Sequence, residues 1–257
     1  MERSKGRPTK ALVTREKISS AALKIVGVQG YEKLTMARVA REIGVGPSAL
    51  YNHVHGKDDL LALVQDAVMA QVDTAALRAA LAGELSPGTA LRTWARSYRD
   101  VFALHAPLVE VIATTPISGA PATQEMYELV ARVLVAAGEP QARIIPRIIA
   151  LESFIYGSSY DAHAPANIFD LPSGGPVSTH TFAAARAAFV ADSAVSADAP
   201  VGSASAGSGF ASAGSRFASA ASASAGSGPV SGPDGGGNPF ADTPFRLGLE
   251  ALLADID

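Results

Sequence analysis

The sequence predicts an all-α fold, and three observations support this prediction. Apolar residues recur at positions i, i+3, i+4 and i+7, which is the period of an amphipathic helix. The first two such sets are Ile18, Ala21, Ala22 and Ile25, then Met36, Val39, Ala40 and Ile43. Glycine and proline residues separate these sets, as they do at helix ends and helix starts. No segment shows the alternation of apolar and polar residues that indicates a β-strand.

Composition limits the class of protein. The chain has 257 residues, 48% of them hydrophobic, which is enough for one large domain or two small ones. It contains no cysteine, which excludes disulfides, thiolate metal sites and cysteine nucleophiles. It has no run of about 18 apolar residues for a membrane span, and its basic first ten residues lack the apolar core of a secretory signal. We therefore expect a soluble cytoplasmic protein with no membrane partner.

The first sixty residues predict three short helices. Residues 1–13 are expected to be a flexible basic arm, and Thr14 is a plausible cap for the helix that follows. Thr35 is expected to cap the second helix. Pro47 suits the first turn of a third helix, because a proline lacks only an N–H group that has no partner there. We expect this third helix to be short and to end at Gly56.

The second and third predicted helices, joined by the tight turn Gly44-Val45-Gly46, have the helix-turn-helix arrangement. In this motif the second helix presents exposed side chains to base edges in the major groove of DNA, while the first lies across the DNA backbone. The apolar spacing predicts a buried set that comprises Val39, Ala40, Val45, Leu50 and Val54. It predicts an exposed set that comprises Ser48, Ala49, Tyr51, Asn52 and His53.

Charge is distributed unevenly along the chain. Residues 1–57 carry eleven lysines and arginines and four glutamates, for a net charge of +7. The rest of the chain carries −10, since the total is −3. A compact basic unit on an acidic body is typical of a nucleic-acid-binding protein. A solvated basic face without a partner is the alternative.

Beyond residue 74 the pattern stays helical. Helices are expected near residues 87–105, 107–114, 122–137 and 140–160, with an alanine-rich helix at 180–190 and a final one at 244–256. Residues 191–240 are dominated by alanine, serine and glycine. Such a segment buries too little apolar surface to offset the entropy of ordering, so we expect it to be a disordered insertion. The expected domains are therefore residues 14–57, and a helical domain formed by 58–190 and 241–257.

The N-terminal residues resemble the DNA-binding domain of the TetR family of transcriptional regulators. The resemblance covers residues 14–73 and is ungapped across the turn. It is carried by Leu34-Thr35, Val39-Ala40, Gly44-Val45, the run from Ser48 to Val54, Lys57 and Leu60-Leu61. It implies that Tyr51 and Lys57 contact DNA phosphates. Such contacts position the protein on the duplex but contribute little to the choice of DNA sequence.

The resemblance implies roles for other residues of the motif. Thr35 would offer its hydroxyl and backbone N–H to a phosphate, and Arg38 would reach a base or the backbone. In the arm, Arg7 would enter a narrow A·T-rich minor groove, with a plain tail as the alternative. The base-reading face would comprise Pro47, Ser48, Ala49 and His53, with Asn52 as a further hydrogen-bonding residue.

The resemblance also implies that the C-terminal domain binds a small-molecule effector and dimerises through its last two long helices, here 140–160 and 244–256. The implied dimer contacts, with the chain's own core as the alternative, are Ile145, Ile148, Ile149, Leu249, Leu252 and Leu253. Candidate effector-binding residues are aromatic or polar residues of the middle helices, again with core as the alternative. They are Trp94, Tyr98, Phe102, His105, Met126, Tyr127, Phe154 and Tyr156.

The implied function is that of a ligand-responsive transcriptional repressor. It would bind a pseudo-palindromic double-stranded DNA operator as a homodimer and be released by an unknown small-molecule effector. No cofactor or metal is expected, because the position that matches the family's magnesium-binding histidine is Val111. An enzyme is not expected, because the chain has no nucleophile elbow, P-loop or zinc-binding His-Glu-x-x-His motif. A DNA-binding protein that senses no ligand is the second alternative.

Overall fold

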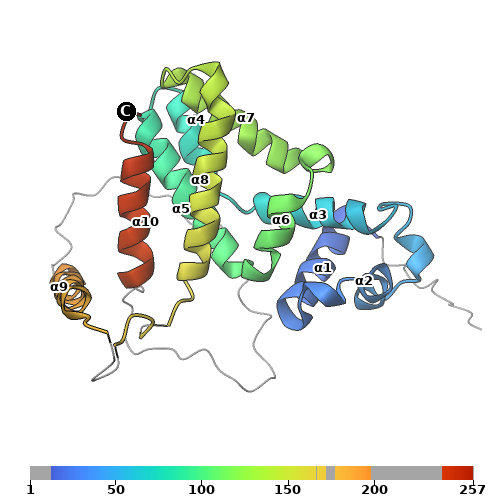
Figure 1. The fold of residues 1–257 in the computed structure, drawn as a ribbon. Coiled ribbons are helices and arrows are strands. Elements are labelled where there is room, and N and C mark those ends of the chain that lie inside the picture. The colour runs from blue at the N-terminus through green and yellow to red at the C-terminus, as the bar shows by residue number, and fades with distance from the viewer. Residues whose placement is uncertain (1–12, 166, 172–176, 198–238, 257) are drawn as a thin grey trace, which may run out of the picture. The chain divides into compact units, whose positions relative to one another are not determined.

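The computed structural model describes residues 13–165, 167–171, 177–197 and 239–256. All regular elements among these residues are helices, as the sequence predicted (Figure 1). The chain divides into two units, one formed by its first 165 residues together with residues 240–257, and the other by residues 166–239. Arg7 lies outside the described residues.

Helices α1 (Arg15–Gln29) and α2 (Met36–Ile43) begin where the sequence predicted, because each is capped by a threonine hydroxyl. Thr14 Oγ1 accepts a hydrogen bond from the Lys17 N–H at 3.3 Å, and Thr35 Oγ1 accepts one from the Arg38 N–H at 3.3 Å. The 3₁₀ turn η1 (Tyr31–Lys33) joins the two helices. Helix α2 ends at Gly44, whose φ of 79° lies in the left-handed region that glycine enters without strain.

The element after this turn is not the α-helix that the sequence predicted. Residues Pro47–Ala49 form the 3₁₀ turn η2, and residues 50–53 continue as hydrogen-bonded turns. Most backbone hydrogen bonds of this segment join residues three positions apart, as does the bond from the Leu50 N–H to the Pro47 carbonyl at 3.0 Å. Few residues separate Gly46 from Gly56, and in so short a segment a 3₁₀ turn avoids the cost of nucleating an α-helix.

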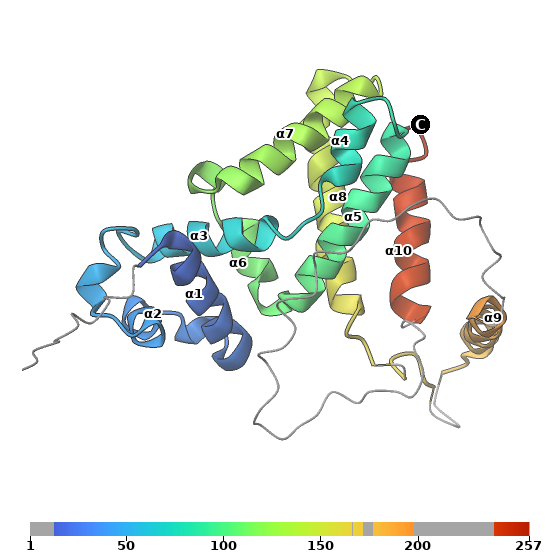
Figure 2. The ribbon, with the colours of Figure 1, turned by 180° about the vertical axis from the view of Figure 1, so that it is seen from behind.

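Helix α3 (Lys57–Met69) leads from this motif into the body. The body contains α4 (Ala75–Leu81), α5 (Pro87–Leu104), η3 (Ala106–Leu108), α6 (Val109–Thr114), η4 (Ile117–Gly119), α7 (Pro121–Ala136), α8 (Gln141–Asp161) and α10 (Pro239–Leu252). The four helices predicted between residues 87 and 160 are confirmed to within a few residues. Helices α5, α8 and α10 run side by side in both views (Figures 1 and 2). The core of this unit includes Trp94, Tyr98 and Phe102 of α5, all fully buried.

Two predicted boundaries were wrong. Helix α9 (His180–Ala197) continues seven residues into the segment that we expected to be disordered, because that stretch is rich in alanine, the best helix former. Helix α10 begins at Pro239 rather than at residue 244, so Pro244 lies inside it. The rest of the predicted disordered insertion, residues 198–238, lies outside the described residues.

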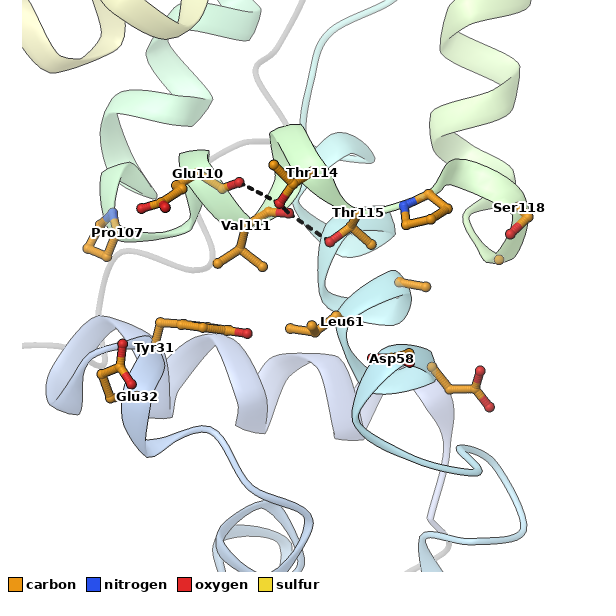
Figure 3. Close-up of a pocket in the computed structure, with 14 residues that line it drawn as sticks. Tyr31, Glu32, Asp58, Leu61, Pro107, Glu110, Val111, Thr114, Thr115 and Ser118 are labelled. Atoms are coloured by element: carbon orange, nitrogen blue, oxygen red, sulfur yellow. Dashed lines mark hydrogen bonds between the residues drawn. The ribbon is translucent and has the colours of Figure 1, made fainter.

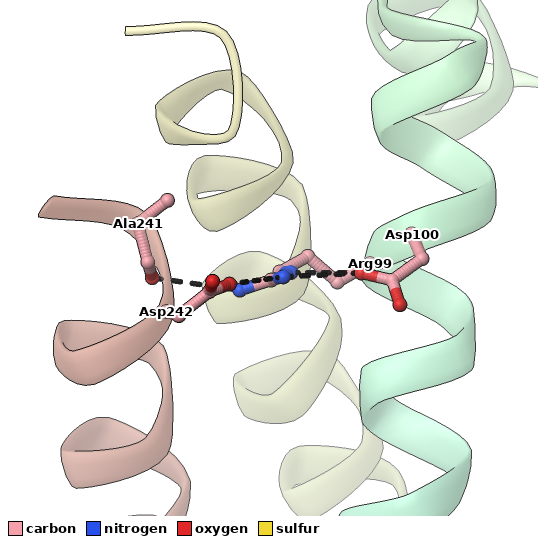
Figure 4. Close-up of polar contacts among 4 residues, drawn as sticks. All are labelled: Arg99, Asp100, Ala241 and Asp242. Carbon is pink, nitrogen blue, oxygen red and sulfur yellow. Dashed lines mark hydrogen bonds and ion pairs between the residues drawn. The ribbon is translucent and has the colours of Figure 1, made fainter. Parts of the chain in front are cut away.

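Helix α10 is held to the body by a buried arginine and a close helix contact. The Arg99 guanidinium on α5 donates to Asp242 of α10 at 2.7 Å (Figure 4). The same group lies 4.6 Å from the centroid of the Phe245 ring on α10. It also bonds the Ala241 carbonyl at 3.4 Å and Asp100 on its own helix. Phe245 stacks on Phe154 of α8, with ring centroids 5.5 Å apart. These contacts make α10 an integral part of the body.

The Arg99→Gln variant is expected to lose about 1–3 kcal/mol of unfolding free energy, because it removes the cation–π contact and the ion pairs that join α5 to α10. Urea denaturation followed by circular dichroism measures the loss. Arg96→Gln is the matched control, since Arg96 lies on the same helix and is exposed. Equal losses in the two variants would contradict the role given to Arg99.

Candidate DNA-binding face and effector-binding body

The turn after Gly46 presents most of the predicted DNA-binding side chains to solvent. Pro47, Ser48, Tyr51 and Asn52 are exposed, and Ala49 and His53 are partly buried. Beneath them Leu50 and Val54 are fully buried, as predicted, together with Val39 and Ala40 of α2. Val45, also predicted to be buried, is only partly so. The core of the motif therefore fixes a short polar surface that points away from it.

Long-range contacts that the sequence did not reveal support this surface. The Arg15 guanidinium on α1 donates to the His53 carbonyl at 3.2 Å, which anchors the end of the turn. The Lys57 ammonium group lies 5.0 Å from the centroid of the Tyr31 ring. Arg15 and Tyr31 were not among the predicted functional residues, because each meets a partner more than twenty positions away in sequence.

Two further residues predicted to contact DNA lie at the start of α2. Thr35 is exposed, and its hydroxyl already caps the helix. Arg38 is partly buried, and its guanidinium donates to the Gln29 side chain at the end of α1. One nitrogen of the Arg38 guanidinium therefore already has a partner within the chain.

In the body, the predicted aromatic residues do not form one site. Trp94, Tyr98 and Phe102 follow one another along α5 with ring centroids 5.6 and 4.7 Å apart. Phe154 lies instead against Phe245 in the contact between α8 and α10, so it is reassigned to the packing of those helices. His105 Nε2 lies 3.1 Å from Gln71 Oε1, and partial burial lowers the pKa of the imidazole.

A carboxylate that sequence reasoning missed lies among these rings. Glu152 Oε1 on α8 accepts hydrogen bonds from Tyr127 at 2.5 Å and Tyr98 at 2.9 Å, and Tyr156 lies 3.3 Å away. Burial raises the pKa of the Glu152 carboxyl, although the tyrosine hydroxyls oppose the shift. The same burial, with the charge of Glu152, raises the pKa of all three tyrosines. No local motif marks Glu152, because Tyr98 is 54 residues away.

The predicted dimer residues divide between the surface and the core. Ile145 and Ile149 are 62% and 56% exposed, and Leu252 is partly buried. Ile148, Leu249 and Leu253 are at most 5% exposed within one chain, so they offer almost no surface to a second subunit and belong to the core. The period of a helix explains the division, because residues one apart point about 100° away from each other.

A cleft of about 660 Å³ lies between the helix-turn-helix and the body (Figure 3). Tyr31 and Leu61 line one side, and Val111 and two hydrogen-bonded threonines line the other. Its lining includes four acidic residues and no lysine or arginine; the acids are Glu32, Asp58, Asp59 and Glu110. Among the described residues, no cluster of His, Cys, Asp or Glu side chains is arranged to hold a metal ion.

Two family models match this chain. Residues 18–64 match the bacterial regulatory proteins of the tetR family, and residues 86–219, more than half of the chain, match the tetracyclin repressor-like C-terminal domain. The chain belongs to the tetR family. Proteins of this family are bacterial regulatory proteins. The first match ends inside α3.

Among curated proteins, the chain is 29% identical over 160 residues to the HTH-type transcriptional repressor DrrR1 of Streptomyces coeruleorubidus, covering 61% of this chain and 56% of the relative. It is 30% identical over 150 residues to an HTH-type transcriptional regulator of Saccharopolyspora erythraea, covering 58% of this chain and 61% of the relative. The matches thus span less than two thirds of either relative.

Solved structures of tetR-family proteins share the fold. The regulator SCO7222 of Streptomyces coelicolor is 27% identical with a TM-score of 0.51, covering 70% of this chain and 86% of that one. ActR of the same organism, solved in complex with actinorhodin, is 20% identical with a TM-score of 0.55, covering 95% of both chains. At that identity the likeness concerns the fold alone. None of the described helices in this tetR-family chain is long and apolar enough to cross a membrane.

Proposed function

We propose that this tetR-family chain is a repressor that binds a pseudo-palindromic operator as a homodimer and is released by a small-molecule effector. The observation that carries the proposal is the short polar surface from Pro47 to His53, held by the fully buried Leu50 and Val54. It lies in a segment of charge +7 on an acidic chain. The repressor activity of DrrR1 and the ligand of ActR agree with this reading.

Dimerisation is supported by an apolar face on α8 that one chain leaves uncovered. Ile145 and Ile149 lie four residues apart on the same side of the helix, and Leu247 of α10 is 54% exposed. Contiguous exposed apolar surface is a mark of interaction sites in soluble proteins. Two subunits joined there would present two recognition turns to successive major grooves, about 34–36 Å apart.

Release by an effector requires a connection between the body and the DNA-binding turn. Asp66 on α3 accepts a hydrogen bond from the Thr123 N–H in the first turn of α7 at 3.0 Å. Helix α7 carries Tyr127, which bonds Glu152, whereas α3 begins at Lys57 beside the DNA-binding motif. A displacement of α7 would therefore pull on α3 and change the position of Lys57. Effector binding would then lower the affinity for DNA, and DNA binding would lower the affinity for the effector by the same coupling free energy.

Selection of bound duplexes from a random DNA pool tests the proposal. We expect enrichment of a two-fold symmetric site, and we expect its affinity to fall about 10³- to 10⁵-fold between 50 and 200 mM salt if six to ten phosphates are contacted. Failure to enrich any sequence, or binding that does not respond to salt, would refute it.

The Lys57→Ala variant is expected to weaken binding to all selected sites similarly and to reduce the slope of log K against log salt by about 1. A change at Ser48 should instead alter the preferred sequence, because that residue lies on the base-reading face. Arg132→Ala is the control, since Arg132 is an exposed arginine of the body. Fluorescence anisotropy of a labelled duplex measures all three variants.

A further inference from the structure

The recognition turn, defined as Pro47 to His53, is not held at its end by backbone hydrogen bonds. Its last N–H group, that of His53, donates to the Leu50 carbonyl at 2.8 Å. Within the described part of the chain, no backbone N–H donates to the His53 carbonyl, and the His55 N–H donates to no backbone carbonyl. A longer helix would continue its bonds through these positions, but a short turn leaves its last carbonyls open. The path of the chain from His53 to Gly56 therefore depends on other groups.

Side chains from two neighbouring helices bond these open backbone groups. The Arg15 guanidinium, in the first turn of α1, donates to the His53 carbonyl at 3.2 Å. The Asp59 carboxylate, in the first turn of α3, accepts a hydrogen bond from the His55 N–H at 2.9 Å. The two bonds lie on either side of Val54, whose side chain is fully buried. Together with that buried side chain, they fix residues 53–55 at the end of the recognition turn.

The stability of α1 does not account for Arg15. This residue directly follows the cap Thr14, and the N-terminus of a helix carries a partial positive charge that disfavours a cation. Arg15 is also exposed, so burial of apolar surface does not account for it either. Asp59, by contrast, suits the start of α3, where an acid is favourable, and Asp58 beside it suits that place equally. The bond to the turn is therefore the contact that gives Arg15 a role, and Asp58 offers a comparison for Asp59.

We infer that Arg15 and Asp59 are positioning residues that determine how strongly the protein discriminates between DNA sequences. They act through the backbone of residues 53–55, which sets the direction of the His53 side chain on the proposed base-reading face. A hydrogen bond to a base edge requires a defined distance and direction, whereas contacts with phosphates carry no sequence information. Loss of either bond should therefore weaken binding to the operator more than binding to other duplexes. This inference rests on the proposed function, because it names residues that set the specificity of the same surface.

The two side chains carry opposite charges, which separates positioning from electrostatic attraction. Fluorescence anisotropy at fixed salt gives the specificity ratio, defined as the affinity for the selected operator divided by that for a duplex of equal length with scrambled half-sites. Arg15→Met keeps an unbranched stem without a donor. This variant and Asp59→Ala are each expected to lower the specificity ratio about fivefold or more, as the loss of one base contact does. A purely electrostatic role predicts weaker binding to every duplex for Arg15→Met and tighter binding for Asp59→Ala, with the ratio unchanged.

Matched variants remove the same charges at neighbouring positions. Arg41→Met removes an exposed arginine of α2, and Asp58→Ala removes the other exposed carboxylate in the first turn of α3. Both should leave the specificity ratio unchanged, whereas Arg15→Lys, which retains a donor and the charge, should recover part of it.

Circular dichroism shows whether each variant is folded, and if Arg15→Met is not, Asp59→Ala decides. A role limited to stability would lower the free energy of unfolding without changing the specificity ratio. An unchanged ratio in a folded Arg15→Met or Asp59→Ala, or an equal loss in the matched variants, overturns the inference. An operator that the unmodified chain still selects leaves the proposed function standing in those cases, whereas failure to select any sequence refutes both.

Discussion

The Gly248→Ala variant is expected to lose about 2–3 kcal/mol of unfolding free energy, because the added methyl group overlaps a packed ring. A Cβ atom at residue 248 would lie 2.6 Å from Cε2 of Phe154, and the ring cannot retreat while it stacks on Phe245. Helix α10 must then move away from α8, which strains the Arg99 contacts as well. Urea denaturation gives the free energy, and the double variant with Phe154→Leu should recover part of it.

Gly27→Ala is the matched control for this prediction. Gly27 also lies inside a helix, but a Cβ atom there meets nothing within 4 Å. Alanine should therefore stabilise the chain by about 0.5–1 kcal/mol through helix propensity. If Gly248→Ala proved as harmless as Gly27→Ala, the close approach of α8 and α10 would be wrong.

The second large effect concerns assembly. Ile145→Glu combined with Ile149→Glu is expected to convert the proposed homodimer to a monomer, because it places two charges in the apolar face that would be buried between subunits. Both side chains are exposed in the single chain, so the fold itself should change little. Loss of the second recognition turn should lower affinity for the full operator about 100-fold or more, since the two half-sites no longer bind together.

Sedimentation equilibrium measures the mass of this double variant, and anisotropy measures its DNA affinity. Leu104→Glu is the control, since Leu104 is a 78% exposed leucine at the end of α5. A double variant that remains dimeric, with an unchanged affinity for the operator, would exclude the α8 face as the subunit contact.

The features that the sequence predicts well are those set by neighbouring residues. The caps Thr14 and Thr35 act on N–H groups three positions away, and the spacing of Trp94, Tyr98 and Phe102 places them on one face of α5. The buried pair Leu50 and Val54 also follows from local spacing.

The features that it does not predict depend on contacts between distant segments. Helical spacing marks Ile145 and Ile148 equally as apolar, but only the packing of other segments against α8 decides that Ile148 is covered within the chain. Glu152 gives no signal of its own, because its role comes from tyrosines on α5 and α7. Whether η2 forms a 3₁₀ turn or an α-helical turn depends on a small difference in free energy between the two. Residue preferences do not distinguish these two kinds of turn.

The acidic cleft between the DNA-binding motif and the body has a kinetic consequence. Its four carboxylates repel phosphates, so a duplex that approaches from that side is turned away. The basic N-terminal segment, with a net charge of +7 over residues 1–57, attracts the same phosphates. Encounters that begin with the recognition turn facing the duplex are therefore expected to be favoured. Productive association should then be faster than random orientation allows, and this advantage should vanish as salt shortens the range of the field.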